Sequence, residues 1–295
     1  MSNQQYCKMR VLIWDMEGEK WDFVVVSVPG KPGPGPSDEY LKVIGPEVQP
    51  DGNGNFTSTA YSEEEINAVH AFAVARLTIH LWEKAVGLKI IWQWNAGKRK
   101  NERPLNIQID DTQSAGFHLV RESAVYGLYK EKRTCKSLDI VSHEITHGII
   151  ESLRPDIHYI NTVKAYAVVE ALADLSAILL HASIPELYLK SADKSNSDLR
   201  LKNPVSEFAE GYGEAGEGIR SALDKVSTAN DSYSLAKPLV NSVYMKLVEK
   251  WEKSPSGIVG LLAWVEELTH YAFYPLLNLR EISPGNYFIK YNVPD

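Results

Sequence analysis

The sequence predicts an α+β fold, with strands concentrated in its first half and helices in its second. Residues 9–15, "MRVLIWD", and 21–28, "WDFVVVSV", are rich in β-branched and aromatic residues and are joined by the polar turn "MEGEK", a pattern typical of a hairpin. A long helical pattern covers residues 62–87, and helical patterns dominate after about residue 138. This separation of strands from helices indicates an α+β arrangement.

The elements of the first half are marked by their boundaries. Prolines and glycines in "KPGPGPSD", from Lys31, and in "DGNGN", from Asp51, interrupt regular structure after the hairpin. Ser62 followed three residues later by Glu65 is a capping-box pattern, and it opens a mostly apolar run that ends at Gly87. We therefore expect one long, largely buried helix between Ser62 and Gly87.

Two further strands and a division into two lobes complete the predicted fold. "LKIIWQW", residues 88–94, and "LNIQID", residues 105–110, are strand candidates. A chain of 295 residues is compatible with one large domain or two smaller ones. We expect a β-rich N-terminal lobe over residues 1–154 and a helical C-terminal lobe over residues 155–295.

Composition and charge narrow the function classes. The chain is 44% hydrophobic and 23% charged, close to the averages of globular proteins, which argues against disorder and against a fibrous class. The net charge of -7 argues against a nucleic-acid partner. Cys7 and Cys135 are too few for a disulfide framework. No secretory signal or membrane span is visible, so we expect no membrane partner and a cytoplasmic or unconventionally exported protein. The oligomeric state is unknown.

The segment "SHEITHGIIESL", residues 142–153, carries two histidines and a carboxylate in an otherwise apolar helical pattern. His143 and His147 are four residues apart, so on a helix both imidazoles project from one face and can bind one metal ion. Glu144 lies about 100° around the helix from His143, where it borders such an ion without ligating it. This is the position of a base that acts on water beside a metal.

A third ligand is expected from the apolar segment "VKAYAVVEALADLSAILLHAS", residues 163–183. Nearly every side of this predicted helix is apolar, yet Glu170 and Asp174 lie four residues apart on one face. A buried carboxylate without a partner is costly or takes up a proton. We therefore predict that Glu170 binds the metal and that Asp174 accepts the other ring N–H of a ligating histidine. Two histidines and one glutamate leave a position for water, as catalytic zinc sites do.

These segments resemble the thermolysin-like neutral metallopeptidases, which are gluzincins with an HExxH motif and a downstream ExxxD. "INAVHAFAVARLTIHLW" is similar to the family's long central helix, "SLDIVSHEITHG" to its zinc helix, "VVEALADLSA" to its third-ligand helix and "LRLKNP" to the segment that follows. The resemblance covers roughly residues 60–245 and implies two lobes with an active-site cleft between them. It also implies one catalytic Zn²⁺ bound by His143, His147 and Glu170. By the same resemblance, Glu144 is the general base and Asp174 is the carboxylate that orients a ligating histidine.

The sequence departs from this family at the residues that would stabilise the transition state. The family has a histidine in an Asp-Asn-Gly-Gly-x-His stretch, whereas the matching segment here, "NDSYSLAKP", places Tyr233 at or near that position. A tyrosine hydroxyl can donate a hydrogen bond to a developing oxyanion. His158 and Tyr159 are both candidates for the family's second donor, a tyrosine shortly after the zinc helix, and we favour Tyr159.

Two other family features are altered. The Asn-Ala-aromatic motif that grips the substrate should fall near "QSAGFHLV", which contains no asparagine. Asp139 keeps one acidic calcium position, but His181 stands where a calcium-binding carboxylate is expected, and neutral imidazole suits Ca²⁺ poorly. Calcium binding is therefore doubtful, and the physiological substrate is not predicted.

The leading hypothesis is a zinc endopeptidase acting on polypeptides, in which the ion and Tyr159 or Tyr233 hold the oxyanion. Ile140, one turn before the first ligand, is expected to line a pocket for large hydrophobic side chains. The alternative is a zinc-containing, catalytically impaired member of the same fold that binds peptides or a partner protein. The altered oxyanion and substrate positions favour the alternative, whereas the retained Glu144 favours the enzyme. An exopeptidase would need a motif that grips a free amino terminus, of the Gly-x-Met-Glu-Asn type, and none is found.

Overall fold

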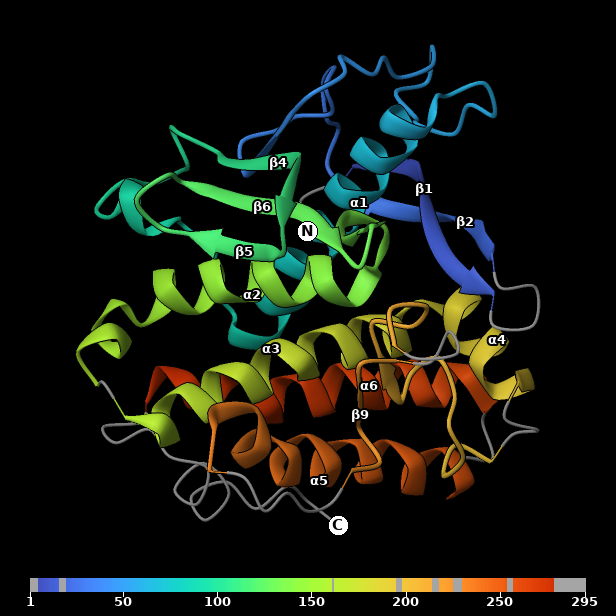
Figure 1. Ribbon diagram of the computed structural model, residues 1–295, viewed down its shortest axis with the longest axis vertical. Helices are drawn as coiled ribbons and strands as arrows, with labels where there is room; N and C mark the ends of the chain where they lie inside the picture. Colours follow the sequence, from blue (N-terminus) through green and yellow to red (C-terminus); the bar gives the residue numbers. More distant parts are fainter. Residues whose placement is uncertain are drawn as a thin grey trace.

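The computed structural model describes residues 5–15, 20–160, 162–194, 198–213, 218–224, 230–253 and 257–278 and shows a mixed α/β fold (Figure 1). Its strands are β1 (Tyr6–Asp15), β2 (Lys20–Pro29), β3 (Leu41–Ile44), β4 (Leu105–Gln113), β5 (Ala115–His118), β6 (Ser123–Tyr129), β7 (Lys132–Arg133), β8 (Glu207–Phe208) and β9 (Arg220–Ser221). Its α-helices are α1 (Glu63–Val86), α2 (Leu138–Leu153), α3 (Val163–Ser183), α4 (Pro185–Lys194), α5 (Ser232–Lys253) and α6 (Gly257–Phe273). Among these helices, none combines the length and the apolar character needed to cross a bilayer.

The strands form a hairpin and a central sheet. β1 and β2 are antiparallel, with Tyr6 paired to Pro29 and Asp15 to Lys20, so the predicted hairpin is confirmed. The central sheet has the order β3-β4-β6-β5, with β7 paired to β6, and its β4 confirms the predicted strand at residues 105–110. β3, β4 and β6 are parallel, whereas β5 runs antiparallel to β6 at the edge. α2 lies between this sheet and a layer formed by α3, α5 and α6 (Figure 1).

α1 begins and ends as the sequence predicts. The Ser62 side chain accepts a hydrogen bond from the Glu65 backbone N–H, and the Glu65 carboxylate accepts one from Ser62 N at 2.7 Å, so both halves of the capping box are present. Gly87 ends the helix in the left-handed conformation, with φ of 70°, which a residue without Cβ adopts at little cost. The predicted single helix is confirmed.

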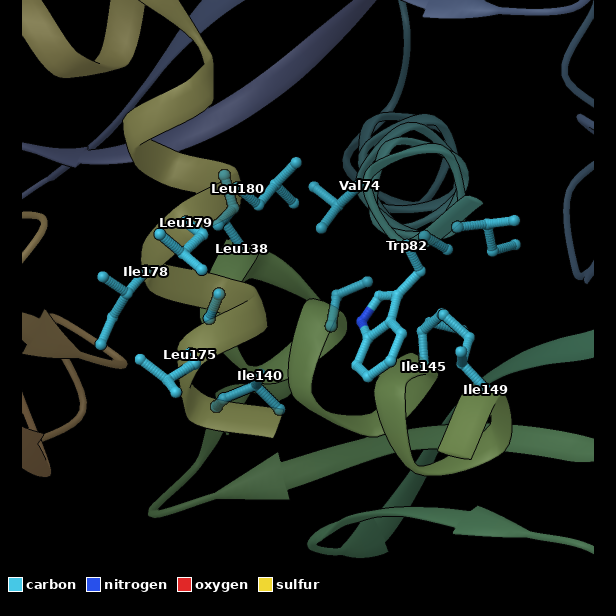
Figure 2. Close-up of a cluster of buried hydrophobic side chains, with 14 of the residues drawn as sticks. Val74, Trp82, Leu138, Ile140, Ile145, Ile149, Leu175, Ile178, Leu179 and Leu180 are labelled. Carbon is cyan, nitrogen blue, oxygen red and sulfur yellow. The ribbon is translucent and has the colours of Figure 1, made fainter. Parts of the chain in front are cut away.

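α1, α2 and α3 pack together through large apolar side chains (Figure 2). Trp82 of α1 is fully buried in this contact; it stacks on Phe273 of α6 at 4.0 Å between ring centroids and donates its indole N–H to Ser176 Oγ of α3 at 2.9 Å. Thr78 of α1 donates to Ser142 Oγ of α2 at 3.0 Å. Because buried polar groups need such partners, these contacts fix both α2 and α3 against α1.

The predicted boundary between two lobes falls directly after α2. This helix contacts β5 of the sheet on one side and α3 on the other. The buried hydrophobic cluster contains residues from both halves of the chain. The division into residues 1–154 and 155–295 therefore stays a prediction.

The predicted strand at residues 88–94 is wrong. Its backbone donors are satisfied by side chains instead of a neighbouring strand, because Ile90 N donates to the Glu83 carboxylate at 3.0 Å and Trp92 N donates to Asn101 Oδ1 at 2.8 Å. Both Ile90 and Trp92 are fully buried. The apolar composition of this segment reflects burial in the core and not membership of a sheet.

His70 is a buried histidine with a structural role. It lies on α1, and its Nδ1 accepts a hydrogen bond from Leu12 N of β1 at 2.8 Å. Burial lowers the pKa of His70 to about 3 from the ordinary value of 6.5. Between these two pH values the ring of the folded protein is neutral, whereas a solvated histidine is protonated. The hydrogen bond attaches the β1–β2 hairpin to α1.

We predict that His70 makes the fold sensitive to acid. In the unfolded chain its pKa returns to the ordinary value of 6.5, so the unfolded state binds a proton below pH 6.5 while the folded state does not until about pH 3. The free energy of unfolding should therefore fall by about 2 kcal/mol between neutral pH and roughly pH 5 through this residue alone.

The variant His70→Gln can accept the Leu12 hydrogen bond without titrating. Urea unfolding at several pH values should show a smaller loss of stability on acidification for this variant than for the native chain. The same pH dependence in both proteins would contradict the prediction.

Candidate metal centre

α2 presents His143 and His147 on the face that meets α3. The helix begins at the N-cap Ser137, whose Oγ accepts a hydrogen bond from Ile140 N at 3.2 Å. One turn separates the two histidines, and their Nε2 atoms lie 3.1 Å apart. His143 is buried, whereas His147 is half-buried. The predicted convergence of the two imidazoles is present.

α3 supplies the third member of the predicted set. Its N-cap is Thr162, whose Oγ1 accepts from Ala165 N at 3.1 Å. Glu170 Oε2 lies 3.2 Å from His143 Nε2, and Glu170 Oε1 lies 3.9 Å from His147 Nε2. The candidate ligand atoms of these three residues all lie within 4.8 Å of one another, and the described part of the chain contains no other such group.

The three side chains fit a divalent metal ion. Two nitrogens bound to one zinc ion in a tetrahedral site lie about 3.3 Å apart, close to the 3.1 Å between His143 and His147. Glu170 Oε2 is buried, and His143 Nε2 lies within ion-pair distance of it. A buried carboxylate is costly without a positive charge beside it, and a metal ion between the three groups would supply that charge.

Negative charge around His143 favours a cation at its Nε2. Burial lowers the pKa of His143, but the carboxylates of Asp174 and Glu170 outweigh it and raise this pKa to about 10. Burial and the neighbouring His143 lower the pKa of His147. Burial raises the pKa of Glu170, but the two histidines outweigh it, so that this pKa is lowered. A proton and a metal ion therefore compete for the same position.

Asp174 orients His143 and is itself held by an arginine. His143 Nδ1 lies 2.9 Å from Asp174 Oδ1, which is the predicted contact. With Nδ1–H donated to a carboxylate, Nε2 is the nitrogen that faces the metal position. Arg220 of β9 donates from Nε to Asp174 Oδ2 at 3.1 Å and from Nη2 to Oδ1 at 2.6 Å. Burial raises the pKa of Asp174, but Arg220 and His143 outweigh it and lower this pKa.

The sequence patterns do not identify Arg220 as part of the site. Its guanidinium lies 4.1 Å from the ring centroid of Phe208 and 4.9 Å from that of Tyr233. Phe208 in turn packs edge-on against His143, with ring centroids 5.4 Å apart. The available signal is that a buried carboxylate such as Asp174 has more acceptor sites than one histidine N–H can fill. That signal does not say which arginine fills them.

The side chain of Glu144 projects from α2 toward the edge strand β5. Its Oε2 accepts a hydrogen bond from Phe117 N at 3.0 Å, so that the sheet fixes one carboxylate oxygen. Gly148, one turn further along α2, permits the close approach of helix and strand, because a Cβ there would lie 2.8 Å from the Phe117 ring. Glu144 lines the same cavity as the candidate metal ligands.

The cavity at the site has a volume of about 370 Å³. Its apolar walls include Phe117, Ile150 and Val169, from β5, α2 and α3. Tyr233 of α5 forms a further wall, and burial, followed by the charge of Glu170, raises the pKa of Tyr233 to about 12. The hydroxyl is therefore protonated at neutral pH and can donate a hydrogen bond.

Glu151 lines the cavity although it is not among the residues predicted from the sequence, whereas the predicted Ile140 does not line it. Glu151 follows His147 by one turn on the same face of α2 and lines the cavity; burial, followed by the charge of Asp156, raises its pKa to about 7. The spacing from His147 is a sequence signal that could have identified Glu151. Ile140 lies in the buried cluster of Figure 2, so its predicted pocket position is wrong because its side chain faces the core.

The second oxyanion donor and the calcium site stay predictions. The side chains of His158 and Tyr159 lie outside the described part of the structure. Asp139 accepts a hydrogen bond from Ala209 N at 2.8 Å, and burial raises its pKa to about 7. Burial lowers the pKa of His181 to about 4. Neither belongs to a converging group of metal-binding side chains among the described residues, and calcium binding stays doubtful.

Comparisons with known proteins find matches among solved structures. No family model matches the sequence, and no curated protein matches it. Among solved structures, the chain is similar to one titled as the precursor of protealysin, a metalloproteinase from Serratia proteamaculans, with a TM-score of 0.41 and 14% sequence identity over 94% of this chain and 89% of that chain.

We predict that removing Arg220 destabilises the fold through Asp174. Arg220→Met leaves a buried carboxylate without its main cation, and breaking a buried pair in this way typically costs about 3–5 kcal/mol. Arg200→Met is a matched control, because Arg200 is exposed and pairs with Glu252; its loss should cost less than about 1 kcal/mol. Urea unfolding of both variants measures the difference. Equal stabilities would contradict the buried role of Arg220.

Proposed function

We propose that this protein is a zinc-dependent endopeptidase that hydrolyses peptide bonds with Glu144 as the general base. The convergence of His143, His147 and Glu170 beside Glu144 in one cavity carries the proposal. Two imidazoles and one carboxylate, with a side open to a cavity, are the usual protein ligands of catalytic zinc. The resemblance of these motifs, in order and spacing, to thermolysin-like metallopeptidases supports the same assignment.

Glu144 would perform the proton transfers of the reaction. When bound, a zinc ion would lower the pKa of a water molecule and act as a Lewis acid on the substrate carbonyl. The Phe117 N–H holds Glu144 Oε2, which leaves Oε1 to accept a proton from that water. Glu144 would then pass the proton to the leaving amine. Because the holding group is the backbone of β5, the position of the base depends on the sheet and not on a flexible side chain.

Asp174 and Arg220 would keep His143 ready to bind the ion. The carboxylate accepts the Nδ1 proton of His143, which fixes the tautomer with Nε2 unprotonated when metal is bound. Arg220 holds both oxygens of that carboxylate. The ring of His143 therefore has little freedom to rotate, and its orientation does not depend on the substrate.

Tyr233 is the residue we assign to the oxyanion, with Tyr159 as the second candidate. Negative charge develops on the carbonyl oxygen during attack, and a donor placed there typically contributes about 10²- to 10³-fold in rate. Tyr233 lines the cavity, and its raised pKa of about 12 keeps the hydroxyl protonated. Its ring lies over the Arg220 guanidinium at 4.9 Å, which restricts its motion.

A polypeptide substrate would lie in the cavity between two walls. β5 and α2 form one wall, and α3 and α5 form the other. These walls belong to the two predicted lobes, residues 1–154 and 155–295, and we propose that the cleft between the lobes is this cavity. Its apolar lining suits hydrophobic side chains of a peptide.

The alternative function is a zinc-containing, catalytically impaired protein that binds peptides or a partner. The observation that favours it is Tyr233, which stands where the resembled family has a histidine and is 44% exposed. The retained geometry of Glu144, held by a dedicated backbone donor, favours the enzyme. A direct test of Glu144 separates the two functions.

We predict that Glu144→Gln retains the metal and loses hydrolysis. The amide cannot take the proton from water, and general-base catalysis typically contributes about 10²- to 10⁴-fold. Cleavage of casein should therefore fall by at least about 10²-fold, while zinc content per chain is unchanged. A chelator should abolish cleavage by the native chain, and added Zn²⁺ should restore it.

The matched control is Glu266→Gln, on the exposed side of α6, where Glu266 pairs with Lys84. This variant should cleave casein at the native rate. Zinc-loaded native protein that cleaves no faster than Glu144→Gln would refute the enzyme and favour the binding protein.

We predict that Tyr233→Phe lowers kcat by about 10²- to 10³-fold with little change in KM. Tyr274→Phe is the matched control, because Tyr274 does not line this cavity and is 38% exposed, close to the 44% of Tyr233. Its removal should leave kcat near the native value. A kcat loss in Tyr159→Phe alone would transfer the assignment to Tyr159.

A further inference from the structure

The segment Glu207–Tyr212, here named the 207–212 segment, packs against the first candidate ligand, His143. The Phe208 ring packs edge-on against His143, with centroids 5.4 Å apart and planes at 69°. Ala209 N donates to Asp139 Oδ2, in the first turn of α2, at 2.8 Å. Phe208 and Ala209 are buried. The segment therefore contacts α2 both at its start and at the metal-facing turn.

The 207–212 segment also supports the arginine behind His143. Phe208 O accepts from Ile219 N at 2.8 Å, next to the pairing of β8 with β9. Arg220 of β9 packs over the Phe208 ring at 4.1 Å and donates two hydrogen bonds to Asp174. A displacement of Phe208 would therefore disturb its packing against the His143 ring. It would also disturb the hydrogen bond of His143 Nδ1, because Arg220 holds the Asp174 carboxylate that accepts it.

The backbone of this segment has conformations that need support from outside it. Ala209 has φ of 55° and Gly211 has φ of 80°. The left-handed region is unfavourable for a residue with a Cβ, and such residues persist where surrounding contacts determine them. The contacts that hold the segment decide whether Phe208 stays against His143.

Those contacts come from the N-terminal half of the chain. Lys132 Nζ of β7 donates to Gly211 O, and Tyr212 Oη donates to Arg133 O. Trp14, near the end of β1, lies directly against Gly211, because a Cβ added to Gly211 would be 2.8 Å from the indole ring. The absence of a side chain at Gly211 is therefore required by Trp14 as well as by φ.

The two tryptophans of the β1–β2 hairpin support each other. Trp14 and Trp21 are cross-strand partners, and their rings pack edge to face at 5.2 Å. Trp21 also packs edge-on against Tyr212 at 6.2 Å. Cross-strand aromatic pairs are held by the register of the strands, so the hairpin presents a fixed surface to the 207–212 segment.

We propose that the 207–212 segment is a positioning element for His143 and that Trp14, by packing on Gly211, sets its conformation. This inference rests on the metal-binding part of the proposed function. Trp14 and Gly211 are positioning residues that act through Phe208, Arg220 and Asp174. A change at their contact should weaken metal binding although every ligand is retained.

The variant Gly211→Ala tests the contact, because the added methyl group meets Trp14. Gly97→Ala is the matched control: Gly97 has φ of 81°, and a Cβ there meets nothing within 4 Å. Metal-free proteins are titrated with Zn²⁺ in competition with a chelating dye, and visible absorption of the Co²⁺-loaded proteins reports the ligand geometry. Gly211→Ala should bind Zn²⁺ about 10- to 100-fold more weakly and show an altered Co²⁺ spectrum, while Gly97→Ala should match the native chain in both.

Variants of Trp14 give an independent test. Trp14→Ala should weaken Zn²⁺ binding, and Trp14→Phe, which keeps an aromatic ring over Gly211, should retain more of it. Thermal unfolding of the metal-free proteins shows which variants are folded. If Gly211→Ala does not fold, the Trp14 variants decide.

The possible failures are distinguishable. Native Zn²⁺ affinity and a native Co²⁺ spectrum in folded Gly211→Ala, or in folded Trp14→Ala, would overturn the inference and leave the proposed function intact. A native chain that binds neither Zn²⁺ nor Co²⁺ would overturn the proposed function itself.

Discussion

The ionised carboxylate of Asp174 is the group on which the site and the packing around it both depend. It lies on a largely apolar helix, and burying it without partners would cost several kcal/mol. Its partners are His143 Nδ1 and two nitrogens of Arg220. These partners come from α2 and β9, whereas Asp174 lies on α3. The carboxylate can therefore be both buried and ionised only when the three elements are packed together. The contacts that stabilise the fold here are the contacts that orient the first imidazole.

α2 divides the chemistry of the site between the two layers that it separates. His143 and His147 face α3, where Glu170 completes the ligand set, whereas Glu144 faces β5 and is held by the Phe117 backbone. One helix can do this because adjacent residues project about 100° apart. Gly148 brings the strand close enough for the backbone contact. The candidate base and the ligands are therefore positioned by different layers, and the helix fixes the distance between them.

The sequence was sufficient wherever the determining interaction is local. The Ser62 capping box fixes the start of α1, and helical spacing alone places His143 beside His147. The pairing of α2 with α3 was also predictable, because Glu170 and Asp174 had no other reason to lie in an apolar helix. Arg220 was not predictable, since it reaches Asp174 from 46 residues away on a two-residue strand without periodicity. Residues 88–94 were misassigned for a related reason, because side chains from elsewhere satisfy their backbone.

The two sides of the cavity differ in whether their charge changes with pH near neutrality. Burial, followed by Glu170, raises the pKa of Tyr233 to about 12, and the Arg220 guanidinium beneath its ring is permanently charged. The side of the cavity formed by Tyr233 therefore keeps the same charge near neutral pH. A histidine in place of Tyr233 would change its charge in that range. The opposite side carries Glu144 and Glu151, and burial, followed by Asp156, raises the pKa of Glu151 to about 7. Outside the ligand set, a change of charge in this cavity near neutral pH therefore comes from Glu151, two helical turns along α2 from the candidate base Glu144.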